Sequence, residues 1–472
     1  MKLLTDYSYK KGSRNLIYPI YEDRRIDAEI TNLLGFDLND EIEKSLGTLT
    51  SVHTLGKLPF SKIIFLGLGS SADMTTRSMR KALGALSEKI KDSMDFALRF
   101  AVTETLDETA IAAIYAETYQ MSQYEEQIQG HDAKVIPKQY VISDAQINSQ
   151  INIQIEEALT TGEIIGKAVN YEKILADTPA NLMTPSILVQ KAQELAARYH
   201  MDCTILDMDK LTEMKAGGIL AVNQGSDEPC AIICIKYQGN GNAPFKAYIG
   251  KGLTFDSGGY NIKSNSYGMK YDMIGGASVL AVMEILAATK ARTNVYGIIP
   301  TTENMISGHG YRPQDVITTL SGKTVEIVST DAEGRMILCD AITYAQTLDV
   351  THIIDMATLT GACARALGTT YTGIFSNDDD FCAEFQDAAN RVDEKVWRLP
   401  MDQEYRDMLK SNSADMKNSA GKPLGGASVA ANFLQEFVNE GVKWVHVDVA
   451  GTGEVDGHAT GVMVRTVAEV LK

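Results

Sequence analysis

The sequence has little that would support a cysteine-based architecture. Its six cysteines are scattered through 472 residues and form no CxxC pair. Cys230 and Cys234 lie closest together, but no second pair follows them at the spacing of a zinc site. Dispersed thiols in a long chain are typical of buried small residues in a reducing compartment. We therefore expect a cytoplasmic protein without a disulfide framework. The cysteines occupy positions 203, 230, 234, 339, 363 and 382.

Two familiar hydrolase motifs are also missing. The chain contains no HExxH, which excludes a zincin-type zinc site, and no GxSxG, so a serine hydrolase is unsupported. Any hydrolytic site must therefore be built from other groups.

Long apolar runs and an excess of basic charge are absent as well. No apolar stretch approaches the ~20 residues of a membrane-spanning helix. The first residues, MKLLTDYSYKKGSRN, show no uninterrupted apolar core of a signal peptide. We therefore expect no membrane association. Lys and Arg number 44 against 61 Asp and Glu, a net charge of −17 that argues against general nucleic-acid binding.

What the chain does contain is an alternation of apolar strands and helices. KIIFLGLG, at 62–69, predicts a strand and a glycine turn before a helix. Its GxG lacks the third glycine of a phosphate-binding loop, which favours a structural turn. A helical stretch at 151–176 reaches from this part of the chain to a second one. Beyond it, apolar runs such as PCAIICIKY and WVHVDVAG alternate with helices. We predict an α/β fold with a smaller domain at 1–150, a connecting helix at 151–176 and a larger domain at 177–472.

Three segments of the larger domain place charged residues where strands end or helices begin, which is where α/β sheets carry their sites. Each acid has a structural alternative by itself. Asp256 before Ser-Gly fits a turn, Asp272 fits a helix N-cap, and Asp331 and Glu333 fit a first helical turn that the helix dipole favours. The segments are GKGLTFDSGG at 250–259 followed by Lys263, MKYDM at 269–273, and STDAEGRM at 329–336 with Arg335.

Taken together, these residues favour a metal site. Four carboxylates, two lysines and an arginine border apolar segments, and none of the seven histidines lies among them. Carboxylate oxygens suit Mg²⁺ and Mn²⁺, and Zn²⁺ accepts them too. Four acids are enough to bridge two cations that lie about 3.5–4 Å apart.

At this point the sequence resembles a known family. STDAEGRM is similar to the signature octapeptide of the leucine (cytosol) aminopeptidase family, and GKGLTFDSGG with MKYDM resembles its other metal-binding segment. DTPANLMTP, DMATLTGA, GGASVAANFLQEF and HVDVAGT extend the similarity over about 177–452. The resemblance implies a metal-dependent aminopeptidase that releases N-terminal, leucine-like amino acids from peptides.

The family's metal-binding roles fall on five residues of this sequence. The resemblance implies that Asp256 and Glu333 bridge two divalent cations and that Asp331 completes the more exchangeable site. Lys251 and Asp272 would complete the tighter site. The expected cations are Mn²⁺ or Zn²⁺, with Mg²⁺ or Co²⁺ as alternatives.

Further roles follow from the same resemblance. Lys263 would polarise the substrate carbonyl, and Arg335 would hold a bicarbonate ion that acts as general base. The resemblance also implies a macro-like N-terminal domain, a catalytic domain whose central mixed sheet is flanked by helices, and a homohexamer. The residues expected to line the substrate groove are Met269, Thr358, Leu359, Gly361 and Ala450.

The sequence departs from the family pattern in three places. Ser329 replaces an asparagine, Met336 replaces a leucine, and the span from Lys263 to Asp272 is about two residues short. Because that span borders the side-chain pocket, we expect it to affect substrate preference. Two alternatives remain open: a Cys-Gly dipeptidase with the same chemistry, and a non-catalytic regulator that binds DNA or nucleotides.

Overall fold

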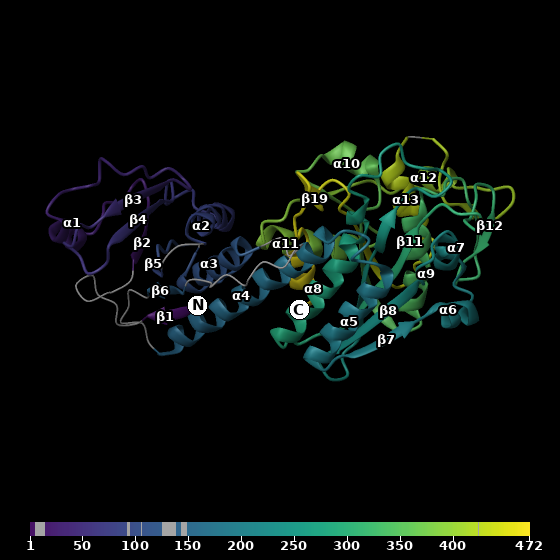
Figure 1. The fold of residues 1–472 in the computed structure, drawn as a ribbon, viewed down its shortest axis with the longest axis horizontal. Coiled ribbons are helices and arrows are strands. Elements are labelled where there is room, and N and C mark those ends of the chain that lie inside the picture. The colour runs from purple at the N-terminus through teal and green to yellow at the C-terminus, as the bar shows by residue number, and fades with distance from the viewer. Residues whose placement is uncertain (5–14, 92–94, 105, 125–137, 143–148, 423) are drawn as a thin grey trace. The chain divides into compact units, whose positions relative to one another are not determined.

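We analysed a computed structural model of the chain, which describes residues 1–4, 15–91, 95–104, 106–124, 138–142, 149–422 and 424–472. Most of the N-terminal segment considered above for a signal peptide lies outside these residues. The chain divides into two compact units within helix α4, between Asn170 and Tyr171. Figure 1 shows an α/β arrangement in each unit, with the smaller one in purple and blue.

The N-terminal unit is built on a six-stranded sheet of order β1-β6-β5-β2-β4-β3. Neighbouring strands are parallel except at the edge, where β3 runs antiparallel to β4. The predicted strand of KIIFLGLG is β4, and the helix after its glycine turn is α2. The strands are Lys2–Leu4, Asn15–Ile20, Leu49–His53, Lys62–Gly67, Phe96–Arg99 and Gln139–Ile142, numbered β1 to β6.

Both faces of this sheet are covered by side chains that alternate along each strand. Ile17 points into a cluster with α2, α3 and α4, whereas its neighbours Leu16 and Tyr18 join a cluster with α1. Helix α4 contributes Ile155 and Leu159 to the first cluster, so its N-terminal half is part of this core. The helices are α1 Ala28–Leu34, α2 Thr76–Ile90, α3 Glu108–Ser122 and α4 Ser149–Asp177.

The C-terminal unit contains a nine-stranded mixed sheet of order β16-β15-β18-β14-β9-β11-β8-β7, and β10 also pairs with β11. The central strands β18, β14, β9 and β11 are parallel, while β15 and β8 run antiparallel on either side. The strands are β7 Asp202–Leu206, β8 Ala231–Gln238, β9 Phe245–Gly250, β10 Gly252–Asp256, β11 Asn294–Asn304, β14 Val350–Ala357, β15 Thr372–Ser376, β16 Val396–Arg398 and β18 Lys443–Asp448.

Short strands and helices complete this unit outside the main sheet. A three-stranded sheet has the order β12-β13-β17, and β19 pairs with β20 as a hairpin. These strands are β12 Val316–Thr318, β13 Thr324–Glu326, β17 Met416–Lys417, β19 Glu454–Val455 and β20 His458–Ala459. The helices are α5 Pro185–Tyr199, α6 Met208–Met214, α7 Gly217–Asn223, η1 Met269–Met273, α8 Ile274–Ala288, α9 Glu333–Gln346, α10 Gly361–Leu367, α11 Asp379–Arg391, α12 Gln403–Asp407, α13 Gly426–Gln435 and α14 Val464–Leu471.

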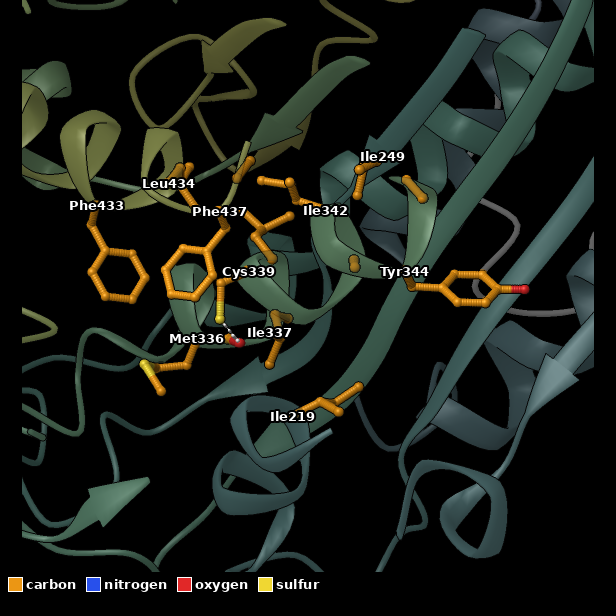
Figure 2. Packing of buried hydrophobic residues seen from close by; sticks show 14 of the residues in the cluster. Ile219, Ile249, Met336, Ile337, Cys339, Ile342, Tyr344, Phe433, Leu434 and Phe437 are labelled. Carbon is orange, nitrogen blue, oxygen red and sulfur yellow. Dashed lines mark hydrogen bonds between the residues drawn. The ribbon is translucent and has the colours of Figure 1, made fainter. Parts of the chain in front are cut away.

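Helices cover both faces of the main sheet. On one face, residues of α7, α9 and α13 belong to the same buried cluster as Ile249 of β9, part of which is drawn in Figure 2. Met336 is fully buried in this cluster, so the sulfur-containing side chain at this position serves as core. On the other face, Val279 and Met283 of α8 lie against Gly297 of β11, where a larger side chain would collide with them.

One helix is an exception to the expectation that no apolar stretch approaches the length of a membrane-spanning helix. Residues Met269–Ala288, which form η1 and α8, are long and apolar enough to cross a membrane by length and composition alone. Of the apolar window, 83% is buried inside the protein. A helix that is apolar on all sides is typical of a domain core. Its composition is therefore explained by its position against the sheet.

The parallel strands bring one set of ends together at an edge of the sheet. Lys251 follows β9, Thr358 follows β14, and Ala450 closely follows β18. Helices η1 and α9 begin near the same edge, because η1 contacts β10 closely and Glu333 contacts Lys251. This edge is where α/β folds place their binding sites.

Candidate metal centre

Lys251 is the buried centre of one half of the site. Its backbone amide donates to the carbonyl of Met356 at 3.0 Å, and its own carbonyl accepts from Gly276 at 2.8 Å. These bonds fix the residue between β14 and the first turn of α8. Only 2% of the residue is exposed, so its ammonium group must find partners within the protein.

The Lys251 ammonium contacts two carboxylates and one carbonyl. Nζ lies 2.6 Å from Oδ2 of Asp272 and 2.9 Å from Oε1 of Glu333. It also donates to the carbonyl oxygen of Thr358 at 3.3 Å. Gly334 makes this approach possible, because a Cβ there would lie 2.8 Å from the Lys251 Nζ. The residue after Glu333 therefore has to be small.

Asp256, Lys263 and Asp331 form the other half. Nζ of Lys263 lies 2.7 Å from Asp256 and 2.5 Å from Asp331. The second oxygen of Asp256 accepts hydrogen bonds of 2.8 Å from the Gly258 amide and from Nδ2 of Asn304. Asp256 is thus held from several sides at the end of β10, whereas the Asp331 side chain is 36% exposed.

Three of these acids are close enough to share a cation. Each of Asp256, Asp331 and Glu333 offers a carboxylate oxygen, and these oxygens all lie within 4.8 Å of one another. Glu333 is 3% exposed, and its Oε2 has no hydrogen-bond partner. An unpaired buried carboxylate oxygen is costly unless a cation or donor satisfies it. The residues therefore fit a divalent cation. Asp272 stands next to Glu333 as a further carboxylate, whereas Lys251 could coordinate a cation only as the neutral amine, since its ammonium form has no lone pair.

Mutual repulsion and burial shift the titration of these acids. Burial raises the pKa of Asp331 to about 6, helped by the charge of Glu333. Burial and the neighbouring carboxylates likewise raise the pKa of Asp256. The pKa of Glu333 is lowered overall. Burial raises it, but the charges of Lys251 and Lys263 outweigh burial and keep the group ionised. Such opposing shifts are typical of a site with too many acids for its own lysines.

The pKa values of both lysines are raised as well. Burial lowers the pKa of Lys251, but Asp272, Glu333 and Asp256 raise it by more. The pKa of Lys263 is raised for the same reason, chiefly by Asp256 after the opposing effect of burial. The acids thus impose a strongly negative potential on the site, which favours cations there.

Arg335 lies in the first turn of α9 and is 8% exposed. Its Nη1 donates to the carbonyl of Asn418 at 2.7 Å, and its buried Nε has no hydrogen-bond partner. Burial lowers the pKa of its guanidinium to about 10, although Glu333, Asp448 and Asp331 oppose this shift. A partly unsatisfied guanidinium fits a small planar anion, since it can donate paired hydrogen bonds.

The site opens into a pocket of about 330 Å³. Among the described residues, this pocket is lined by all five predicted metal ligands, by Lys263 and by the five predicted groove residues. Arg335 is the one predicted site residue that does not line it. The groove residues are Met269, Thr358, Leu359, Gly361 and Ala450.

Sequence reasoning missed several residues of the pocket. Thr360 follows the predicted Leu359 and accepts the amide of Cys363 as the cap of α10, a signal that was available in LTGA. Glu454 follows the HVDVAGT segment and belongs to no motif recognised in the sequence. Ser329, which departs from the family pattern, accepts the backbone amide of Asp331 at 3.2 Å. The missed lining residues are Tyr267, Gly268, Tyr271, Thr360 and Glu454.

Fold and site together define a metal-dependent hydrolase with carboxylate ligands. The model of the cytosol aminopeptidase family's catalytic domain matches residues 170–468, and that of its N-terminal domain matches residues 26–128. The chain belongs to the cytosol aminopeptidase family. It is therefore a metallo-exopeptidase of the leucyl aminopeptidase type, in a family of two-metal enzymes that act on peptides.

A solved structure is similar over nearly the whole chain. The bottromycin maturation enzyme BotP is 28% identical, with a TM-score of 0.85. The similarity covers 98% of this chain and 99% of that one. Both units of this chain therefore have counterparts in that structure.

Proposed function

We propose that this enzyme releases N-terminal amino acids, leucine-like and others, from peptides with the help of two divalent cations. The observation that carries the proposal is the arrangement of Glu333. One of its buried oxygens contacts Lys251 and the other has no partner, and Glu333 also offers a carboxylate oxygen to the cluster with Asp256 and Asp331. A carboxylate placed in this way can serve two cations at once.

In this proposal Asp256 and Glu333 would help to hold both cations. Asp331 would complete one site, and Asp272 with Lys251 as the neutral amine would complete the other. The grouping is supported by the contacts, since Lys251 joins Asp272 to Glu333 and Lys263 joins Asp256 to Asp331. Oxygen-rich donors are compatible with Mn²⁺ and Zn²⁺, and Mg²⁺ or Co²⁺ are alternatives.

The remaining catalytic roles would fall to side chains of the protein. Bound divalent cations lower the pKa of water, so that hydroxide is available near neutral pH. Lys263, whose side chain is 20% exposed towards the pocket, would face the substrate carbonyl and stabilise its developing negative charge. Arg335 would hold bicarbonate through its unsatisfied Nε, and this anion would accept a proton.

The walls of the pocket support the choice of substrate. Met269, Leu359 and Ala450 give apolar surface, while Thr358 and Gly361 leave room beside it. An apolar pocket next to a metal cluster suits an aliphatic side chain whose scissile amide lies at the metals. The substrate's free α-amine would approach the same cations, which accounts for the restriction to N-terminal residues.

Hydrolysis of leucine 4-nitroanilide tests the proposal. Protein stripped with EDTA should be inactive, and Mn²⁺ or Zn²⁺ should restore turnover. Glu333→Ala should lose activity and bind fewer metal ions per subunit in elemental analysis, because this carboxylate serves both cations. A fully metallated and active Glu333→Ala protein would overturn the two-metal assignment.

Assembly, location and domain limits belong to the same proposal. We expect a cytoplasmic homohexamer, which light scattering would report as about six times the monomer mass. A stable, active monomer at micromolar concentration would contradict this assembly. We take residues 1–150, 151–176 and 177–472 as the N-terminal domain, the connecting helix and the catalytic domain.

A further inference from the structure

One carboxylate in the pocket has no part in the metal cluster. Five acids line the pocket, and four of them contact Lys251 or Lys263. The fifth is Glu454, the first residue of β19. Among the described residues, no basic side chain lies within ion-pair distance of it. The pocket thus contains a negative charge that neither lysine neutralises.

Hydrogen bonds tie the turn that holds Glu454 to helix η1. Its Oε1 accepts the backbone amide of Gly457, which closes the turn between β19 and β20. The carbonyl of Gly457 in turn accepts the hydroxyl of Tyr271, a residue of η1. Glu454 lines the same pocket as Met269 and Ala450, which are proposed to take the substrate side chain.

The turn accounts for only part of the hydrogen-bonding capacity of this carboxylate. A carboxylate can accept about four hydrogen bonds, and the Gly457 amide supplies one at Oε1. Glu454 is partly buried, so its remaining capacity faces a partly desolvated space. In such a space a charge pair is stronger than in open water.

We infer that Glu454 selects peptides whose N-terminal residue is lysine or arginine. The inference rests on the proposed aminopeptidase function and concerns the same pocket. The methylene stem of such a side chain would lie along Met269 and Ala450, and its cationic head would pair with Glu454. Long basic side chains commonly bury their stems against apolar surface while the charged group reaches a polar partner. The chain's net charge of −17 also attracts cationic peptides to the enzyme.

The test compares the anilides of lysine and norleucine, whose side chains differ only by the terminal ammonium group. We expect wild-type enzyme with Mn²⁺ to have a higher kcat/KM for lysine than for norleucine. Glu454→Gln, which keeps the shape and removes the charge, should lower this lysine-to-norleucine ratio about tenfold, as expected for a charge pair worth about 1.4 kcal/mol. The matched control is Glu440→Gln, which changes the same charge at an exposed residue outside the pocket and should leave the ratio unchanged.

Each outcome decides the matter. A ratio that is the same in Glu454→Gln and wild type, or a wild type that cleaves norleucine anilide but rejects lysine anilide, would overturn the role of Glu454 while leaving the aminopeptidase function intact. If neither anilide is cleaved with Mn²⁺ or Zn²⁺, the proposed function fails and the inference fails with it. A ratio that falls equally in Glu440→Gln would attribute the preference to net charge and refute the pocket assignment.

Discussion

The carboxylate of Asp448 accepts the hydroxyl of Thr360 at 2.6 Å, which ties the end of β18 to the loop after β14. The other carboxylate oxygen accepts the backbone amides of Leu359 at 3.2 Å, Thr360 at 3.4 Å and Ala450 at 3.1 Å. Asp448 is 1% exposed and does not itself line the pocket. It therefore shapes two walls of the pocket from behind.

Replacing Asp448 should damage substrate binding more than metal binding. Asp448→Asn keeps one carbonyl acceptor but loses the charge, and we expect kcat/KM for leucine anilide to fall at least about tenfold, mainly through KM. Metal content should stay normal. Thr360→Ser, which retains the hydroxyl, is the control and should remain close to wild type. Loss of metal in a folded Asp448→Asn protein would show that the loop contacts serve the metal centre instead.

Substitutions of Lys251 and Lys263 should have different effects on the enzyme. Lys251 contacts the acids of one proposed metal site, so Lys251→Ala should reduce metal content. Lys263→Ala should keep both metals and lower kcat about 100-fold, because it removes a group that stabilises developing charge. Elemental analysis beside single-substrate kinetics separates the two. Equal loss of metal in both variants would refute this division of roles.

Arg335 should affect catalysis without affecting metal content. Its buried Nε lacks a partner, so an anion bound there would satisfy it. We expect Arg335→Ala to lower kcat strongly. In carbonate-depleted buffer, added bicarbonate should stimulate the wild type and leave the variant unchanged. Arg335→Lys tests whether charge alone is sufficient, since lysine cannot donate the same paired hydrogen bonds. An identical bicarbonate response in wild type and Arg335→Ala would assign Arg335 a structural role.

Glu172, in the C-terminal half of α4, should make stability depend on pH. It is fully buried, and burial together with the charge of Asp177 raises its pKa well above the usual range, which Lys173 offsets only in part. The folded state therefore binds a proton more tightly than the unfolded state. The resulting stabilisation is complete below about pH 4.3, the pKa of an unperturbed glutamate. It is lost as the pH rises towards the pKa of Glu172 in the folded protein, at up to about 1.4 kcal/mol per pH unit.

Glu172→Gln removes this dependence. Its melting temperature relative to wild type should therefore increase between pH 5 and pH 8. The control is Glu157→Gln on the same helix, where the side chain is exposed and no such trend is expected. A difference between Glu172→Gln and wild type that does not change with pH would contradict the prediction.

The sequence by itself was sufficient for much of the fold. Apolar runs buried on both faces predicted the central strands, and Asp331 and Glu333 fitted the first turn of a helix. In the structure that helix begins at Glu333, and Gly334 in its first turn leaves room for the Lys251 side chain. Hydrophobic pattern is local, so it fixes an element's type better than its first residue. The apolar helix Met269–Ala288 illustrates a further limit, since composition alone does not distinguish a core helix from a membrane span.

The sequence also determined which residue types are available for chemistry, and resemblance to a family assigned them candidate roles. Tertiary structure decided which of them meet. Asp256, Asp272 and Glu333 are separated by up to 77 residues, yet β10, η1 and α9 bring all three to one pocket. The pairing of Asp448 with Thr360 depends on strand order. The position of Glu454 depends on the turn between β19 and β20, which is hydrogen-bonded to η1. These are long-range relationships set by packing of the whole unit, and no local pattern in the chain encodes them.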